Sequence, residues 1–130
     1  MRAERRTYPA PSTNVENERY YQAAAEGKLL IGKCKACNEV HHYPRAICPA
    51  CMSTDVDWVP VSGKGTVYSF SVMRRAPVPY AIAYIRLDEG VTVITNIVDC
   101  ELDEIAVGQA MQLTFGETED GHKLPLFTPA

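Results

Sequence analysis

Four cysteines in two short pairs could bind one metal ion. Cys34 and Cys37 form the first Cys-x-x-Cys knuckle, and Cys48 and Cys51 form the second after ten intervening residues. Each knuckle turns its two sulfurs toward one point, so four thiolates can converge on a tetrahedral Zn²⁺. The spacing therefore predicts a zinc ribbon in preference to two disulfides or four thiols packed in a core. A rubredoxin-like iron site would use the same sulfurs, so the choice between zinc and iron stays open.

This ligand set predicts a structural role for the metal. Four cysteines fill a tetrahedron and leave no position for a catalytic water. His41 and His42 lie between the knuckles, where a hydrogen bond to a thiolate or surface exposure is favoured over direct ligation. The fifth cysteine, Cys100, has no partner nearby. We interpret it as a small buried or half-buried residue, since nothing around it would activate a nucleophile.

Charge and composition limit the classes of function. The chain has 130 residues, a net charge of −3 and 46% hydrophobic residues, as expected for one globular domain or two small lobes. We expect a cytoplasmic protein, because no apolar run could span a membrane, no secretory pattern is present and the cysteines suit a reducing compartment. Residues 28–86 carry eight Lys or Arg against three acids, and residues 87–130 carry nine acids against one Lys. The basic part suits a phosphate-bearing small molecule, and the acidic part disfavours nucleic acid.

The pattern along the chain predicts three regions. Residues 1–27 form an extended polar arm and a helix, which a capping box of Thr13 and Glu16 would start and Gly27 would end. Residues 28–61 form the ribbon, with strands over 28–33, 40–43 and 57–61. Residues 62–130 hold strands and turns, and the expected strands are 66–73, 80–87, 91–98, one marked by Met111, Leu113 and Phe115, and one within 124–129.

These elements predict a mainly β fold with an N-terminal helix, a rubredoxin-like four-cysteine zinc ribbon and a five-stranded OB-fold barrel. In the first barrel strand, alternation places on one face Tyr68, Phe70 and Val72. One side of the helix, which we expect to pack on the body of the protein, carries Tyr20, Tyr21, Ala24 and Ala25. An alternative is that the arm, the short helix and the Pro-rich tail become ordered on a partner.

Several short motifs occur in one order and carry a family resemblance. They are the four-cysteine ribbon with Tyr43-Pro44-Arg45 before its second knuckle, the run from Ser62 to Ser69, Pro79-Tyr80, Leu87-Asp88-Glu89-Gly90, and Leu124-Pro125-Leu126-Phe127. Over roughly Tyr20 to Pro129, the chain resembles the acyl-CoA-associated family of zinc-ribbon plus OB-fold proteins, long catalogued as a domain of unknown function. Departures from the family pattern at Asn38, at Met52 and at Tyr20-Tyr21 leave the subfamily open.

The resemblance implies an accessory role. Members of the family accompany a thiolase-superfamily enzyme, and sometimes a hydratase, as small subunits that complete or bridge the partner's acyl-CoA site. For this chain it implies a hetero-oligomer in lipid or aromatic acid degradation, with structural zinc and a shared coenzyme A thioester. Thiolase, acyltransferase or aldolase catalysis would then belong to the partner. We predict no catalytic residue here, since no nucleophile pairing or phosphate loop stands out.

Basic and aromatic side chains are the candidates for contact with coenzyme A. Arg74 and Arg75, on the first long loop of the barrel, would meet the phosphates, and Tyr80 would stack or donate a hydrogen bond. Arg45 and Lys64 are second choices. Three alternatives stay open: a nucleic-acid-binding ribbon and OB module, a partner of an enoyl-CoA hydratase, and a free-standing acyl-CoA carrier or thioesterase-like enzyme.

Overall fold

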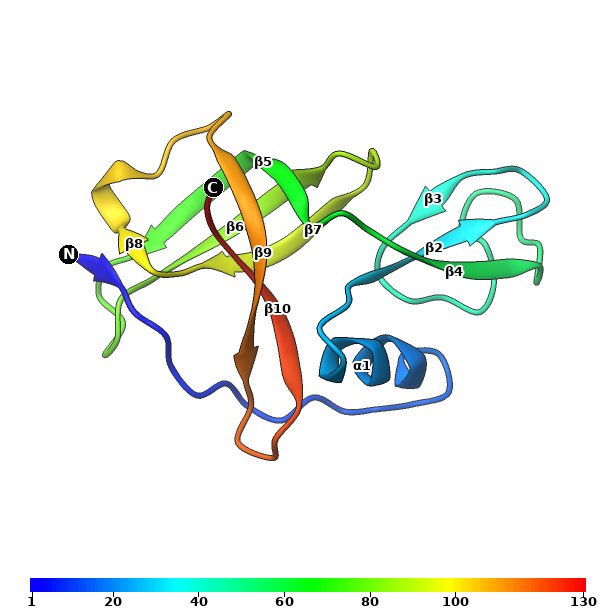
Figure 1. The fold of residues 1–130 in the computed structure, drawn as a ribbon, viewed down its shortest axis with the longest axis horizontal. Helices are drawn as coiled ribbons and strands as arrows, with labels where there is room; N and C mark the ends of the chain where they lie inside the picture. Colours follow the sequence, from blue (N-terminus) through cyan, green and yellow to red (C-terminus); the bar gives the residue numbers. More distant parts are fainter.

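The computed structural model describes residues 1–130 as a helix, a small three-stranded ribbon and a larger barrel (Figure 1). β1 (Arg2–Ala3) and α1 (Glu18–Ala25) come first, and β2 (Leu30–Cys34), β3 (Val40–His41) and β4 (Val56–Pro60) form the ribbon. The remaining elements are β5 (Lys64–Met73), β6 (Tyr80–Leu87), β7 (Thr92–Ile97), β8 (Cys100–Glu101), the 3-10 helix η1 (Leu102–Glu104), β9 (Ala110–Glu117) and β10 (Lys123–Pro129). No helix is long and apolar enough to cross a membrane.

Five strands close into a barrel in the order β10-β7-β6-β5-β9. Strands β5, β6 and β7 form an antiparallel meander, β9 pairs with the start of β5, and β10 runs antiparallel to β9. The barrel closes where Phe127 of β10 pairs in parallel with Ile97 of β7. This arrangement confirms the predicted mainly β fold with a five-stranded barrel of the OB type.

A bulge in β5 changes which side chains share a face of this strand. The register of β5 against β6 shifts between Val67 and Ser69, so Tyr68 is the extra residue. Val67 is buried, Phe70 and Val72 pack against the same core, and Tyr68 is 62% exposed. The predicted grouping of Tyr68 with Phe70 and Val72 is therefore wrong, because the bulge inverts the alternation at this point.

Helix α1 begins later than the capping-box pattern predicts. It begins at Glu18 and not near Thr13, and the turn before it is held by the side chain of Asn14, whose Oδ1 accepts a hydrogen bond from the backbone N–H of Glu16 at 2.9 Å. Glu16 caps nothing, because its Oε2 accepts a hydrogen bond from the backbone N–H of Ala46 at 2.7 Å. The capping box is therefore wrong, and Glu16 instead connects the start of the helix to the ribbon.

The helix packs on the protein itself, as predicted. It contacts β2 and β10, and it lies between the ribbon and the barrel (Figure 1). Tyr20 and Ala24 are buried, whereas Ala25, expected on the same side, is exposed. Gly27 follows the helix with a φ of +81°, a left-handed conformation that favours glycine, so the predicted end of the helix is confirmed.

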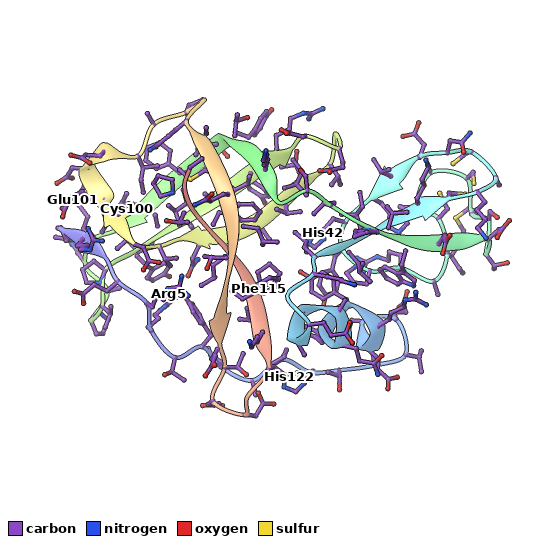
Figure 2. All side chains as sticks on the ribbon, in the orientation of Figure 1. Arg5, His42, Cys100, Glu101, Phe115 and His122 are labelled. Atoms are coloured by element: carbon purple, nitrogen blue, oxygen red, sulfur yellow. The ribbon has the colours of Figure 1, made fainter.

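The N-terminal arm is extended but is fixed along the barrel. β1 pairs with β8, which leaves Ala3 only 1% exposed. The guanidinium of Arg5 donates to the Asp99 carboxylate at 2.8 Å and to the Phe115 carbonyl at 2.7 Å (Figure 2). Further along, Tyr8 is buried and its backbone N–H donates to the carbonyl of Glu117 at 3.3 Å. These contacts hold the arm against the barrel of the same chain.

Candidate functional site

The sulfur atoms of the four ribbon cysteines converge. All four Sγ atoms lie within 4.8 Å of one another. Those of Cys34 and Cys51 are 3.5 Å apart, and those of Cys37 and Cys48 are 3.7 Å apart. A tetrahedral ion with metal–sulfur bonds of about 2.3 Å would hold its sulfurs about 3.8 Å apart. The four cysteines are therefore positioned to bind a metal ion, with no position left for water.

Two turns of matching geometry build the knuckles. The backbone N–H of Asn38 donates to the Cys34 carbonyl at 2.8 Å, and that of Met52 donates to the Cys48 carbonyl at 2.9 Å. Both residues have left-handed backbones, with φ of +62° at Asn38 and +67° at Met52. Asparagine tolerates this conformation, whereas the Cβ of a methionine is crowded in it.

Replacing Met52 by glycine is expected to raise the free energy of unfolding by about 1 kcal/mol, because glycine has no Cβ to crowd the left-handed backbone. The Met52 side chain is 74% exposed, so its removal loses little packing. Urea unfolding of the metal-loaded protein, followed by Trp58 fluorescence, measures the change. Asn38→Gly is the matched control with a smaller expected gain, and an Asn38 effect as large as that at Met52 would contradict this account.

Crowding of the thiols links metal binding to proton release. Backbone hydrogen bonds, first from Cys37, lower the pKa of Cys34 to about 7. At Cys37, a backbone hydrogen bond from Glu39 lowers the pKa, but burial and the neighbouring thiols outweigh it and raise the pKa to about 12. Protons therefore remain on the metal-free cluster at neutral pH, and a metal ion displaces them. Metal affinity is accordingly expected to increase with pH.

His41 of the ribbon and Cys100 of β8 do not belong to this cluster of four cysteines. His41 is buried against Gly32 of β2, where any Cβ would overlap its imidazole, and neither ring nitrogen has a hydrogen-bond partner. Both interpretations offered for His41, a thiolate hydrogen bond and surface exposure, are therefore wrong. Cys100 is half-buried on β8, as predicted, and burial raises the pKa of its thiol. A thiol held in the protonated form is a poor nucleophile.

The five residues predicted to meet coenzyme A do not form one cluster. Arg74 and Arg75 follow β5, whereas Lys64 begins it, and at about 3.3 Å per residue roughly 30 Å of strand separates the two ends. Arg45 belongs to the ribbon, which lies beyond the Lys64 end (Figure 1). Only Tyr80, the first residue of β6, shares the loop end with Arg74 and Arg75.

Arg6, which was not predicted as a site residue, lies at the same end of the barrel as the β5–β6 loop. The guanidinium of Arg6 lies over the Tyr80 ring at 4.1 Å, so one face of this ring is covered. Arg6 also donates to Asn96 Oδ1 at 3.3 Å. Arg74 forms an exposed ion pair with Asp103 at 2.7 Å. No sequence pattern predicts this position of Arg6, because it depends on how the N-terminal arm packs along the barrel.

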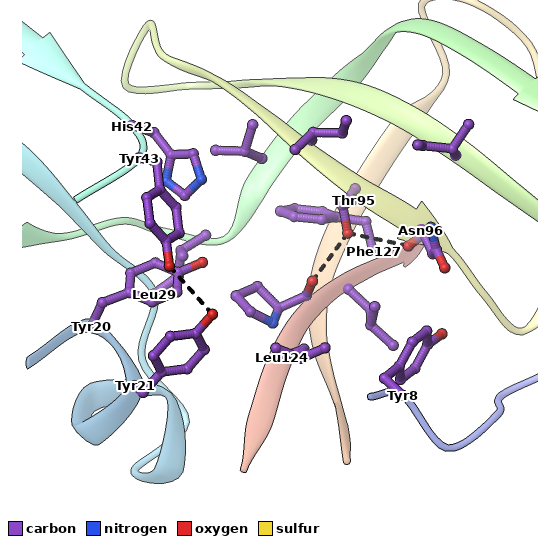
Figure 3. A pocket seen from close by; sticks show the side chains of 15 residues that line it. Tyr8, Tyr20, Tyr21, Leu29, His42, Tyr43, Thr95, Asn96, Leu124 and Phe127 are labelled. Carbon is purple, nitrogen blue, oxygen red and sulfur yellow. Dashed lines mark hydrogen bonds between the residues drawn. The ribbon is translucent and has the colours of Figure 1, made fainter. Parts of the chain in front are cut away.

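A cavity of about 310 Å³ lies where the helix, the ribbon and the barrel meet (Figure 3). It is lined by 15 residues, of which 11 are hydrophobic and none is Asp, Glu, Lys or Arg. The ribbon contributes His42 and Tyr43, the helix contributes Tyr20 and Tyr21, and the rest of the wall comes from barrel strands, from Tyr8 of the arm and from Leu29 before β2. No sequence pattern predicts this cavity, because its wall comes from segments that are far apart along the chain.

The polar groups of this wall are neutral. Burial lowers the pKa of His42 to about 4 and raises the pKa values of Tyr20 and Tyr21. The hydroxyl oxygens of Tyr21 and Tyr43 are 3.4 Å apart, at the long limit of a hydrogen bond. His42 Nδ1 is buried and has no hydrogen-bond partner. The cavity thus combines apolar walls with a few uncharged hydrogen-bonding groups.

A closed four-thiolate site joined to a five-stranded barrel defines a class, the zinc-ribbon plus OB-fold proteins. Family models agree: residues 22–57 match "ChsH2, rubredoxin-like zinc ribbon domain", and residues 58–116 match "ChsH2, C-terminal OB-fold domain". The chain is 38% identical over 112 residues to a DUF35 domain-containing scaffold protein from Methanocaldococcus jannaschii, and 79% of each chain is covered. The chain therefore belongs to the DUF35 family, and the resemblance stated from the sequence is confirmed.

Further relatives include parts of acyl-CoA enzymes. A chain of the solved Ltp2-ChsH2(DUF35) aldolase is 35% identical, with a TM-score of 0.84 over 92% of this chain and 98% of that one. The "Probable enoyl-CoA hydratase alpha subunit" of Thermomonospora curvata is 36% identical over 127 residues, which cover 94% of this chain but only 40% of that relative. The benzoylsuccinyl-CoA thiolase subunit BbsA of Geobacter metallireducens is 31% identical over 88 residues, covering 65% of this chain and 59% of that one.

Proposed function

We propose that this chain is a non-catalytic, zinc-binding accessory subunit of a thiolase-superfamily enzyme. In this role it helps to bind acyl-CoA and to assemble the complex for carbon–carbon bond cleavage or formation. The observation that carries the proposal is the likeness, over 92% of the chain, to the corresponding chain of the Ltp2-ChsH2(DUF35) aldolase. The relative named as a thiolase subunit supports it further.

The geometry of the metal site supports a structural role for the zinc, with catalysis by the partner. Four thiolates around one zinc ion leave it no open position, so the zinc would stabilise the ribbon and supply no activated water. The ring nitrogens of His41 are buried without partners, and Cys100 is held as a thiol, so neither offers an activated nucleophile. The nucleophile and the general base would therefore come from the partner.

Co-purification tests the proposal. The untagged chain is expressed with a thiolase-superfamily protein of its source organism, and the complex and each part are assayed for metal content and acyl-CoA turnover. The expected result is a stable complex with one zinc per copy of this chain and turnover only when both proteins are present. Turnover by this chain alone, or full activity of the partner without it, would overturn the assignment.

A hydratase partner is the second candidate, and the 36% identity to a hydratase alpha subunit favours it. The chain spans only 40% of that relative, so the activity of the whole hydratase subunit comes to this chain only as a proposal. The same co-purification with the subunits of an enoyl-CoA hydratase distinguishes the two. Hydration of an enoyl-CoA that requires this chain would favour the hydratase, and cleavage of a carbon–carbon bond would favour the thiolase-type partner.

Reversing both loop arginines, Arg74→Glu with Arg75→Glu, is expected to weaken acyl-CoA binding by the complex at least about tenfold. The reason is that a hydrogen bond to a charged group contributes about 1.5 kcal/mol or more. The ion pair of Arg74 with Asp103 is exposed, so its loss leaves the fold intact. Calorimetric titration with coenzyme A measures the affinity.

A matched control reverses two basic residues away from this loop, Lys64 at the opposite end of β5 and Arg45 in the ribbon. Arg45→Glu with Lys64→Glu changes the net charge by the same amount, and it is expected to change the affinity by less than about twofold, since exposed charges more than a Debye length away are screened. Equal losses in both double variants would assign the effect to net charge. Unchanged affinity in the Arg74 and Arg75 variant would remove the loop from the coenzyme A site.

A further inference from the structure

We propose that the cavity between α1, the ribbon and the barrel binds one uncharged ring system, aromatic or alicyclic, that carries a hydroxyl or carbonyl oxygen. Nothing in this proposal depends on a partner subunit or on the accessory function proposed above. It rests on the size of the cavity, the aromatic rings in its wall, the absence of Asp, Glu, Lys and Arg from the lining residues and the unpartnered imidazole nitrogen of His42.

The volume of the cavity sets the size of the ligand. Its 310 Å³ fall at the lower end of the range found for small-molecule sites, about 300 to 1,000 Å³. An apolar cavity of about 150 Å³ is enough to bind benzene. This cavity therefore has room for two fused rings, or for one ring with a short side chain.

Aromatic faces in the wall favour a ring over a flexible chain. The ring centroid of Tyr20 lies 5.7 Å from that of His42 and 5.6 Å from that of Tyr43, and the planes are tilted by 54° and 58°. Aromatic pairs at these distances prefer offset or edge-to-face geometry, which a further ring can extend. Across the cavity lie Leu124 and Phe127 of β10 (Figure 3). A ligand ring thus meets aromatic edges and faces on one side and apolar side chains on the other.

The wall excludes charge. None of the 15 lining residues is Asp, Glu, Lys or Arg, and Arg6 contacts Tyr8 and Asn96 of the wall without itself lining the cavity. A buried phosphate or carboxylate would therefore lose its hydration without direct contact to an ionic partner. Arg74 and Arg75, the candidates for phosphate contact, lie on the β5–β6 loop and do not line the cavity. The ligand portion inside the cavity is therefore neutral.

The unpartnered ring nitrogen of His42 indicates that the ligand ring carries an oxygen. His42 Nδ1 is buried without a hydrogen-bond partner, although buried polar groups nearly always have one. The Tyr43 hydroxyl accepts a hydrogen bond from Asn17 Nδ2 at 3.2 Å, whereas the Tyr21 hydroxyl has only the long 3.4 Å contact with Tyr43 and keeps hydrogen-bonding capacity unused. A ligand hydroxyl or carbonyl would satisfy these groups, and this gives the cavity selectivity among rings of equal size.

Titration of the metal-loaded chain with 2-naphthol tests the proposal, with backbone amide NMR shifts as the readout. The matched probe is 2-naphthoate, which has the same two rings but a carboxylate. Saturable one-to-one binding of 2-naphthol, with shifts centred on His42 and Tyr21, is expected, and 2-naphthoate should bind at least about tenfold more weakly because its charge would be buried without a partner. Absence of saturable binding by 2-naphthol, or equal binding of both probes, would overturn the proposal.

Two variants locate the site. Leu124→Trp fills the cavity from a half-buried position and should weaken 2-naphthol binding at least about tenfold, whereas Val78→Trp, at a 41% exposed loop residue, should have no effect. His42→Phe keeps a ring but removes its nitrogens, so the affinity for 2-naphthol should fall about fivefold while that for naphthalene does not fall. Binding that survives Leu124→Trp in a folded protein, or equal losses for both ligands in His42→Phe, would contradict the assignment.

Discussion

Replacement of Cys34 by serine is expected to release the metal and to unfold the outer part of the ribbon, while the barrel stays folded. Cys34 and Cys48 are both 0% exposed, and the four Sγ atoms lie within 4.8 Å of one another. Over residues 35–57 the only buried residues are His41, Pro44 and Cys48. This lobe has no hydrophobic core of its own, so the metal must supply its stability.

The expected effect is large because metal binding and folding are coupled in such a lobe. Apparent binding free energies of structural zinc in zinc-finger peptides are about 10 to 16 kcal/mol. The inner end of the ribbon behaves differently, since Leu29 and Ile31 belong to the main core that includes Ile85 and Phe127 of the barrel. Loss of the metal should therefore unfold the segment that carries the knuckles and leave Leu29 and Ile31 in place.

The single tryptophan makes this outcome measurable. Trp58 lies on β4 opposite Gly32 of β2, so its emission reports on the ribbon, and amide NMR spectra report on the barrel. In Cys34→Ser, metal analysis should find less than one ion per chain and Trp58 should become solvated, with the barrel signals retained. Cys100→Ser is the matched control and should keep one ion per chain and native Trp58 emission. A Cys34→Ser protein that retains its metal and its ribbon would contradict the structural role.

Local chemistry explains which features could be predicted from the sequence. The two knuckles are short turns whose residues are neighbours in the chain, so their spacing alone indicated four converging sulfurs. β6 was predicted to the residue, because it alternates buried Ala81, Ala83 and Ile85 with more exposed side chains. The left-handed turn at Asn38 likewise depends on one residue and its two neighbours.

The features that could not be predicted all depend on contacts between distant segments. Arg5 finds Asp99 and Phe115 more than ninety residues away, and this contact turns a polar arm into a fixed part of the barrel surface. The bulge at Tyr68 appears only when β5 is aligned with β6. The cavity depends on even more segments, because its wall forms only where the helix, the ribbon and the barrel meet. No local sequence pattern therefore places His42 in it.

Truncation of Phe127 to alanine is expected to lower the free energy of unfolding by about 4 kcal/mol, in the upper part of the range for buried phenylalanines. Phe127 is 0% exposed in the main core, and its pairing with Ile97 closes the barrel. The backbone carbonyl of Phe127 also accepts a hydrogen bond from the N–H of Val98 at 2.9 Å. Because Phe127 lines the existing cavity of about 310 Å³, the deleted ring would enlarge a space that the walls already fail to fill.

This variant distinguishes a barrel strand from a tail that becomes ordered only on a partner, two alternatives that the proline-rich sequence of residues 124–129 left open. Urea unfolding of the metal-loaded protein, followed by circular dichroism, measures the loss. Tyr68→Ala removes an aromatic ring of similar size from a 62% exposed position on β5, and its expected cost is only about 0.5 kcal/mol. If β10 were an unattached tail, both substitutions would cost equally little. A difference of several kcal/mol between them would establish that the C-terminal strand is needed for the barrel to be stable without any partner.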